Sequence, residues 1–230
     1  MKLLVVSDIH GYVDKFKDVL IKEDDIEMII FTGDIAPYRK HFETINLLNK
    51  LLTIVRDFNI NYIIAIPGNV DYIHHYEQLE NPIFIYLHKR YKKVKDIVFI
   101  GLGGSTITPF HTMLEFSEEE IYKDLQSTYI SYIQNEKTLN KNKIVLVTHS
   151  PPYNSLCDKI FTGEHVGSKA IRSFIEDVKP LLALCGHVHE SRCIDKISTT
   201  TVVNPGPLAK GFYGTIYISC ERIDIKLNKI

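Results

Sequence analysis

Short runs of apolar residues alternate with stretches of helical periodicity along most of the chain. The apolar runs predict buried strands at residues 3–6, 27–32, 62–66, 83–86, 96–102, 144–148 and 181–185. Apolar residues at helical spacing predict helices over residues 12–23, 39–58, 72–79, 117–134 and 168–178. Strands that alternate with helices indicate βαβ units around a parallel sheet, so the pattern places the chain in the α/β class.

The last part of the chain has a different pattern. Strands are predicted near residues 201–203, 214–219 and 222–227, and the last two alternate like a hairpin around Cys220 and Glu221. Ser117 and Glu120 have the spacing of a capping box at a helix start. The polar segment 135–143 reads as a surface loop, too short to divide domains, so we expect a single domain over residues 1–230.

Composition narrows the classes of partner. The formal net charge is −1 and no basic or acidic block stands out, which disfavours long nucleic acid without excluding a local basic patch. The four cysteines, Cys157, Cys185, Cys193 and Cys220, have no paired CxxC spacing, which predicts reduced structural thiols. Neither a leader segment nor an apolar stretch of membrane-spanning length is evident, so we expect a cytoplasmic protein without a membrane partner.

Five of the apolar runs end on side chains that can bind a metal ion. These are Asp8 with His10, then Asp34, Asn69, His149, and His187 with His189. One polar residue at a strand end is an ordinary structural feature, but five recurrences at the edge where α/β sheets carry their chemistry favour a site. Imidazole and oxygen donors suit Mn, Fe, Zn, Co or Ni. Seven ligands exceed one four-coordinate zinc and predict two metal ions.

The spacing of these residues resembles the calcineurin-like metallophosphoesterase superfamily. The resemblance rests on Asp8-x-His10, Gly33-Asp34, Gly68-Asn69-x-Asp71, His149 and Gly186-His187-x-His189, and Asn204-Pro205-Gly206 is similar to the family's closing turn. It implies a four-layer α/β/β/α sandwich of two mixed β-sheets flanked by helices. It also implies hydrolysis of a phosphate ester by in-line attack of a metal-bridging hydroxide.

The resemblance also assigns roles to the seven ligands. It implies that Asp8, His10 and His189 bind one metal ion, that Asn69, His149 and His187 bind the other, and that Asp34 bridges them. Asp34, Asn69 and His149 are the expected catalytic residues, and Asn69 would also contact the phosphoryl oxygens. Manganese is the ion expected first, with iron, nickel, zinc or cobalt as alternatives.

One position departs from the family pattern. Many members have a histidine directly after the asparagine, which protonates the leaving oxygen, whereas this chain has Val70, which cannot donate a proton. His74, His75, His111 or water remain as donors. His111 is the most interesting of these for substrate binding, because its loop follows a predicted strand end, although an exposed loop histidine is the competing interpretation.

The resemblance leaves several functions open. The GNxD variant is similar to phosphodiesterases, so a diester of a small molecule is the expected substrate, and Asp71 is expected to orient a neighbouring ligand or to cap a helix. A phosphomonoesterase or phosphoprotein phosphatase, a protein-binding scaffold of the same fold, and another metal-dependent hydrolase are the alternatives. Phe110, Phe161 and Phe212 are predicted to be exposed apolar loop residues, which is consistent with a homo-oligomer.

Overall fold

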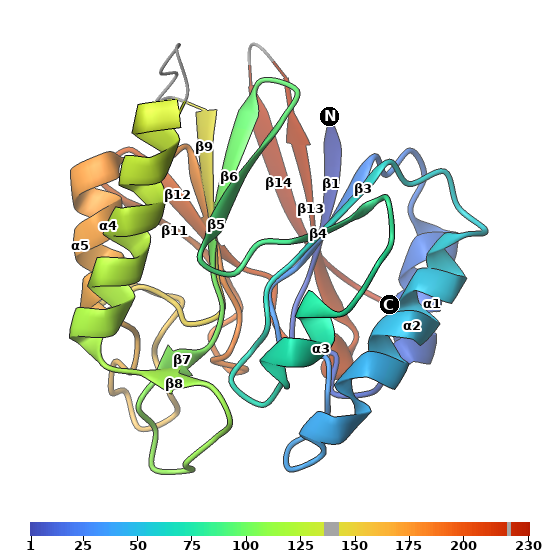
Figure 1. Cartoon of the computed structure of the whole chain (residues 1–230), viewed down its shortest axis with the longest axis horizontal. Coiled ribbons are helices and arrows are strands. Elements are labelled where there is room, and N and C mark those ends of the chain that lie inside the picture. The colour runs from blue at the N-terminus through green and yellow to red at the C-terminus, as the bar shows by residue number, and fades with distance from the viewer. Residues whose placement is uncertain (136–142, 220–221) are drawn as a thin grey trace.

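Two mixed β-sheets pack face to face between two layers of helices (Figure 1). The computed structural model describes residues 1–135, 143–219 and 222–230. The first sheet has the order β14 (Ile223–Lys229), β13 (Phe212–Ile218), β1 (Lys2–Val6), β2 (Met28–Phe31), β3 (Tyr62–Ala65) and β4 (Phe84–Tyr86). The second has the order β11 (Cys193–Ile197), β12 (Thr200–Asn204), β10 (Leu182–Leu184), β9 (Ile144–Thr148), β6 (Ile97–Leu102) and β5 (Arg90–Val94). The predicted four-layer sandwich is confirmed.

Each sheet has a parallel centre and antiparallel edges. Strands β1 to β4 run parallel, as do β6, β9, β10 and β12, whereas β13, β14, β5 and β11 pair antiparallel with their neighbours. The carboxyl ends of the central strands therefore share one side of the molecule, the lower side in Figure 1. This side is where an α/β protein gathers its functional loops.

Three apolar cores hold the layers together. Helices α1 (Val13–Lys22), α2 (Thr44–Val55) and α3 (Ile73–Glu77) cover the first sheet, and α4 (Glu118–Asn135) and α5 (Lys169–Val178) cover the second. In β1, Leu4 and Val6 face the helices while Leu3 and Val5 face the other sheet. Because both faces are buried, the central strands are continuous apolar runs rather than alternating ones.

Several boundaries differ from the sequence-based expectation. The helix expected over residues 39–58 is a short 3₁₀ turn, η1 (His41–Glu43), followed by α2. The edge strands β5 and β11 were not predicted, because their sequences RYKKV and CIDKI carry polar residues where a buried run has none. The capping box is confirmed: Ser117 N donates to Glu120 Oε2 at 2.8 Å and Glu120 N donates to Ser117 Oγ at 3.2 Å.

Two further expectations fall beyond the part of the chain that the structure describes. The loop predicted at residues 135–143 lies largely outside the described residues, and so does the hairpin turn at Cys220 and Glu221.

A small parallel pair, β7 (Ser105–Thr106) and β8 (Glu115–Phe116), was not predicted. It follows β6 on the side of the strand ends.

The prediction of reduced thiols is wrong for two of the cysteines. Cys157 and Cys193 form a disulfide, and Cys185 is buried and free. The spacing of 36 residues concealed this pair, because only the fold brings the loop after β9 beside β11. No helix in the described ranges is both long and apolar enough to cross a bilayer.

The three phenylalanines expected to be exposed differ in their surroundings. Phe110 and Phe161 are 67% and 88% exposed. Phe212 lies in β13 rather than in a loop, and the side chains of Arg192 and Lys229 cover its ring. Of these three rings, Phe110 and Phe161 therefore form the free apolar surface.

His88 is a buried core residue next to β6. Its Nδ1 accepts a hydrogen bond from Gly103 N at 2.9 Å, and its ring stacks between those of Tyr86 and Phe116. Burial, reinforced by the charges of Lys89 and Arg90, lowers the pKa of His88 from 6.5 to about 3. The folded state therefore holds this imidazole neutral.

We expect His88 to make the protein less stable as the pH falls. Below pH 6.5 the unfolded chain binds a proton that the folded chain refuses until about pH 3. Since each pH unit in this window is worth about 1.4 kcal/mol, roughly 2 kcal/mol is lost from His88 between pH 6.5 and pH 5. Urea unfolding of the parent and of His88→Asn at pH 7 and pH 5 measures this loss of stability. The variant should lose less stability over that interval, and equal losses would contradict the prediction. Exposed His74, changed to Asn, is the control.

Candidate metal centre

The loops that follow β1 and β2 are joined through their backbones. Asp8 N donates to Gly33 O, and His10 N donates to Asp34 O, both at 3.0 Å. Asp8, His10, Asp34 and His187 all have left-handed backbone angles, with φ of 52°, 46°, 54° and 68°. Such a conformation costs on the order of 1 kcal/mol or more for a residue other than glycine. Four strained residues in one site indicate that their orientation is maintained by the surrounding loops.

The first cluster consists of Asp8, His10 and His189. His189 Nε2 lies 3.2 Å from Asp8 Oδ1 and 3.2 Å from His10 Nε2. His10 Nδ1 lies 3.0 Å from the carbonyl of Ala36, so this nitrogen carries the ring's proton and donates it. The Nε2 lone pair of His10 therefore points toward the other two side chains of the cluster.

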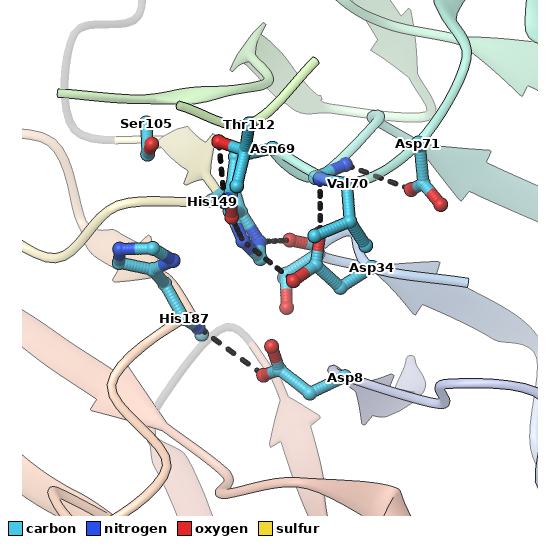
Figure 2. A network of polar contacts seen from close by, with 12 residues as sticks. Asp8, Asp34, Asn69, Val70, Asp71, Ser105, Thr112, His149 and His187 are labelled. Carbon is cyan, nitrogen blue, oxygen red and sulfur yellow. Dashed lines mark hydrogen bonds and ion pairs between the residues drawn. The ribbon is translucent and has the colours of Figure 1, made fainter. Parts of the chain in front are cut away.

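The second cluster consists of Asp34, His149 and His187, with Asn69 beside them (Figure 2). His149 Nδ1 lies 2.8 Å from the carbonyl of Thr32 and donates to it, which leaves a lone pair on Nε2. That Nε2 lies 2.9 Å from Asn69 Oδ1 and 3.4 Å from Asp34 Oδ2. With the His149 ring neutral, all three atoms present electron pairs to one another.

Asp34 connects the two clusters. Its Oδ2 lies 3.4 Å from His149 Nε2 and 3.9 Å from His10 Nε2. Acceptor atoms that face one another without a donor repel, unless a proton or a cation lies between them. The donor set, imidazole nitrogen and carboxylate oxygen without sulfur, fits divalent first-row metal ions. The two clusters are therefore consistent with a dimetal site, whose metal identity the donor set leaves open.

The charges of the two clusters also shape their protonation. Burial opposes ionisation of Asp8 and Asp34, yet the neighbouring histidines lower the pKa of both carboxyls. Burial would lower the pKa of His149, but the charges of Asp34 and Asp8 and the hydrogen bond to Asp34 raise it to about 9. Burial and the charge of His149 lower the pKa of His187 to about 4. Burial would also lower the pKa of His189, but its hydrogen bond to Asp8 and the charges of Asp8 and Asp34 raise it. His149 and His189 are thus the rings that favour a compensating proton.

Asp71 fixes the two loops that carry Asp34 and Asn69. Its carboxylate is 1% exposed and accepts hydrogen bonds from Ile35 N at 3.2 Å, Ala36 N at 2.9 Å and Gly68 N at 2.9 Å. Tyr76 Oη also donates to it at 2.7 Å. Asp71 orients the ligand loops and does not cap α3, which settles the two alternatives that the sequence left open.

Asn69 is oriented by residues that sequence reasoning missed. Its Nδ2 donates to Thr112 Oγ1 at 2.9 Å, and Thr112 Oγ1 donates in turn to Glu115 Oε1 at 2.5 Å. This chain fixes the amide so that Oδ1 faces His149 (Figure 2). No local pattern pointed to Thr112, because its partner lies 43 residues away.

Two glycines let the loops approach closely enough to form the site. A Cβ on Gly68 would lie 1.9 Å from Asp34 Oδ1, and one on Gly186 would lie 1.8 Å from Ser7 Oγ. Asn204 supports the second loop, because its Nδ2 donates to the carbonyl of Val188 at 3.0 Å. Any side chain at either glycine would displace an aspartate loop.

The other histidines considered from sequence lie outside the two clusters. His111 is exposed and lines a pocket of about 430 Å³ beside Val70, together with Arg39 and His41. His74 forms an exposed pair with Glu77 on α3, and His75 packs edge-on against Tyr72. Val70 is buried, and its N–H donates to Asp34 Oδ1 at 3.0 Å. His111 thus lies at the rim of the site.

Comparisons with known proteins agree with this geometry. The sequence model of the family described as "Calcineurin-like phosphoesterase" matches residues 1–191. "Uncharacterized protein MJ1162" of Methanocaldococcus jannaschii is 38% identical over 223 residues, which cover 94% of this chain and 92% of that protein.

Solved structures share the fold at low sequence identity. The protein TT1561 of Thermus thermophilus has a TM-score of 0.72 at 16% identity, over 98% of this chain and 97% of that one. A dimetal phosphatase from Danio rerio has a TM-score of 0.62 at 11% identity, over 100% of this chain and 96% of that one.

Replacing Asp71 should disturb the two clusters indirectly, because Asp71 belongs to neither of them. Asp71→Asn places an N–H against at least one of the backbone donors that the carboxylate now accepts, so the unfolding free energy should fall by about 2 kcal/mol. Affinity for added Mn²⁺ should fall by about 10–100-fold, because the loops of Asp34 and Asn69 lose their common anchor. Urea unfolding and metal titration measure the two effects. Asp224→Asn, at an exposed position of β14, is the matched control. An Asp71→Asn variant with the same stability and metal affinity as this control would contradict the anchor role.

Proposed function

Because the chain belongs to the calcineurin-like phosphoesterase family, we propose that it is a dinuclear metal-dependent phosphodiesterase acting on small-molecule phosphoesters. The observation that carries this proposal is the convergence of acceptor atoms from five strand ends, with the carboxylate of Asp34 between two groups of three ligands. A protein-binding scaffold has no need for such a costly arrangement of unpaired acceptors and strained backbone.

The ligands divide into two sets. Asp8, His10 and His189 would hold one ion, His149, His187 and Asn69 would hold the other, and Asp34 would contact both. Two divalent cations, once bound, supply Lewis acidity toward a phosphoryl oxygen and an acidified water for in-line attack. We propose Mn²⁺ as the ion bound, with iron, nickel, zinc or cobalt as alternatives that the same imidazole and oxygen donors also suit.

Individual residues keep the site ready for this reaction. The carbonyls of Ala36 and Thr32 hold His10 and His149 in the tautomer whose lone pair faces inward. Thr112 holds the amide of Asn69 in place for contact with a phosphoryl oxygen. His111, at the rim beside Val70, is proposed to contact the substrate.

Val70 supports a preference for diesters. A phosphodiester carries one negative charge, whereas a monoester dianion carries two. The isopropyl group of Val70, next to Asn69, offers neither a proton nor a positive charge to the second negative charge of a monoester. The site therefore gains less from a monoester than a site with an imidazolium at this position.

Asp34→Asn should remove most of the activity. This substitution withdraws the carboxylate that reaches both clusters, so turnover of bis(4-nitrophenyl) phosphate with Mn²⁺ should fall by more than about 10²-fold. Circular dichroism should show the parent's secondary structure. Asp224→Asn is the control and should retain the parent's rate. An Asp34→Asn variant with the parent's turnover would exclude the mechanism.

A panel of esters and metals tests the substrate class. Metal-stripped protein is given Mn²⁺, Ni²⁺, Zn²⁺ or Mg²⁺ singly, and rates are compared for bis(4-nitrophenyl) phosphate and 4-nitrophenyl phosphate. We expect Mn²⁺ to restore the diester rate above the monoester rate. The reverse order would make the protein a monoesterase, and a protein that binds close to no metal and hydrolyses neither ester would be a scaffold.

A further inference from the structure

A groove adjoins the second ligand cluster at His187. It has a volume of about 860 Å³ and lies between three segments, residues 106–110, 153–169 and 187–190. Exposed apolar side chains line it, among them Ile107, Phe110 and Phe161. Apolar walls beside a phosphate-binding centre suit the organic part of an ester rather than its phosphoryl group.

His165 lines this groove and is held by a buried carboxylate. Its Nδ1 lies 2.7 Å from Asp158 Oδ1, and Asp158 is fully buried. Because an ionised carboxylate only accepts hydrogen bonds, the Nδ1 proton of His165 is committed to Asp158. The ring side chain is 28% exposed, so its Nε2 is the nitrogen left to exchange a proton with a ligand in the groove.

Asp158 is itself fixed by the backbone. Its two oxygens accept hydrogen bonds from Asn154 N at 3.0 Å, Ser155 N at 2.9 Å and Gly167 N at 3.0 Å. These donors set the position of the carboxylate independently of His165. An imidazole oriented by a buried carboxylate is an arrangement that recurs among general acid–base catalysts.

The hairpin that carries His165 is tied to the ligand loop. Ile160 N donates to Glu164 O at 2.9 Å, and Val166 N donates to Asp158 O at 3.0 Å, so the hairpin has its own backbone bonds. Ser191 Oγ donates to the carbonyl of Lys159, which connects the hairpin to the segment that follows His189. His165 is therefore positioned relative to the metal ligands and is not a loose surface residue.

The geometry points to His165 as the general acid of the reaction, with Asp158 as its positioning residue; this assignment rests on the proposed function. As water attacks phosphorus and the bond from phosphorus to the leaving oxygen breaks, His165 Nε2 gives its proton to that oxygen, and the alcohol departs into the groove. The proton released by the attacking water restores the imidazolium. Asp158 keeps its hydrogen bond from Nδ1 throughout.

The remaining histidines are less suited to this role. His41 and His111 line the separate pocket beside Val70. Among the residues that the structure describes, neither ring has a carboxylate partner that would orient it, as Asp158 orients His165. Residue spacing offered no reason to select His165, because its partner lies seven residues earlier in a loop whose turns bring the two together.

The experiment compares two leaving groups in His165→Gln. Gln keeps a donor for Asp158 but cannot transfer a proton. With Mn²⁺ bound, kcat/KM for a methyl phosphodiester with a benzyl alkoxide leaving group should fall by about 10²–10⁴-fold. The loss for the 4-nitrophenyl ester should stay below about tenfold, because that leaving group needs little protonation. His74→Gln is the matched control and should change neither rate.

A second variant separates catalysis from structure. Added imidazole should restore part of the benzyl-ester rate of His165→Ala and none of the 4-nitrophenyl-ester rate. Equal losses for both esters, or no rescue, would overturn the assignment of His165 and leave the proposed function standing. A parent protein without metal-dependent turnover would overturn the proposed function and this assignment with it.

Discussion

Acceptor atoms that face one another govern the structure of this protein's site. Lone pairs point into a common space from five side chains, those of Asp8, His10, Asp34, Asn69 and His149. Behind these side chains, carbonyl or hydroxyl oxygens accept hydrogen bonds from the nitrogens that carry protons. Such an arrangement is unfavourable by itself. It exists because the surrounding loops, glycines and buried Asp71 leave these side chains few other orientations. A cation or a proton placed between these acceptor atoms would offset their repulsion.

The strand-end pattern made the clustering of these side chains predictable. Parallel strands that are buried on both faces appear in sequence as continuous apolar runs, and their carboxyl ends must meet at one edge. A polar residue after each run, such as Asp34 after β2 or His149 after β9, was therefore sufficient to propose a shared site. The sequence could not show which nitrogen of each imidazole faces inward, since that depends on carbonyls distant in the chain.

Other features depended on contacts that no local pattern encodes. The edge strands β5 and β11 have half-exposed, mixed sequences, and their place follows from pairing with buried neighbours. Thr112 meets Asn69 only because the segment after β7 folds back over the strand ends. In sequence, His165 does not differ from any other loop histidine, because its hydrogen bond to Asp158 depends on the turn between them. In each case the information lies in the tertiary fold rather than in residue spacing.

The Cys157–Cys193 bond has a consequence for the groove beside His187. Cys157 directly precedes Asp158, and Cys193 begins the strand that follows the His187–His189 loop, so two sides of the groove share one covalent frame. Those sides cannot move apart from each other. The third side, residues 106–110, is not part of this frame. If the groove takes the organic part of an ester as proposed, selectivity among substrates is expected to depend on that segment.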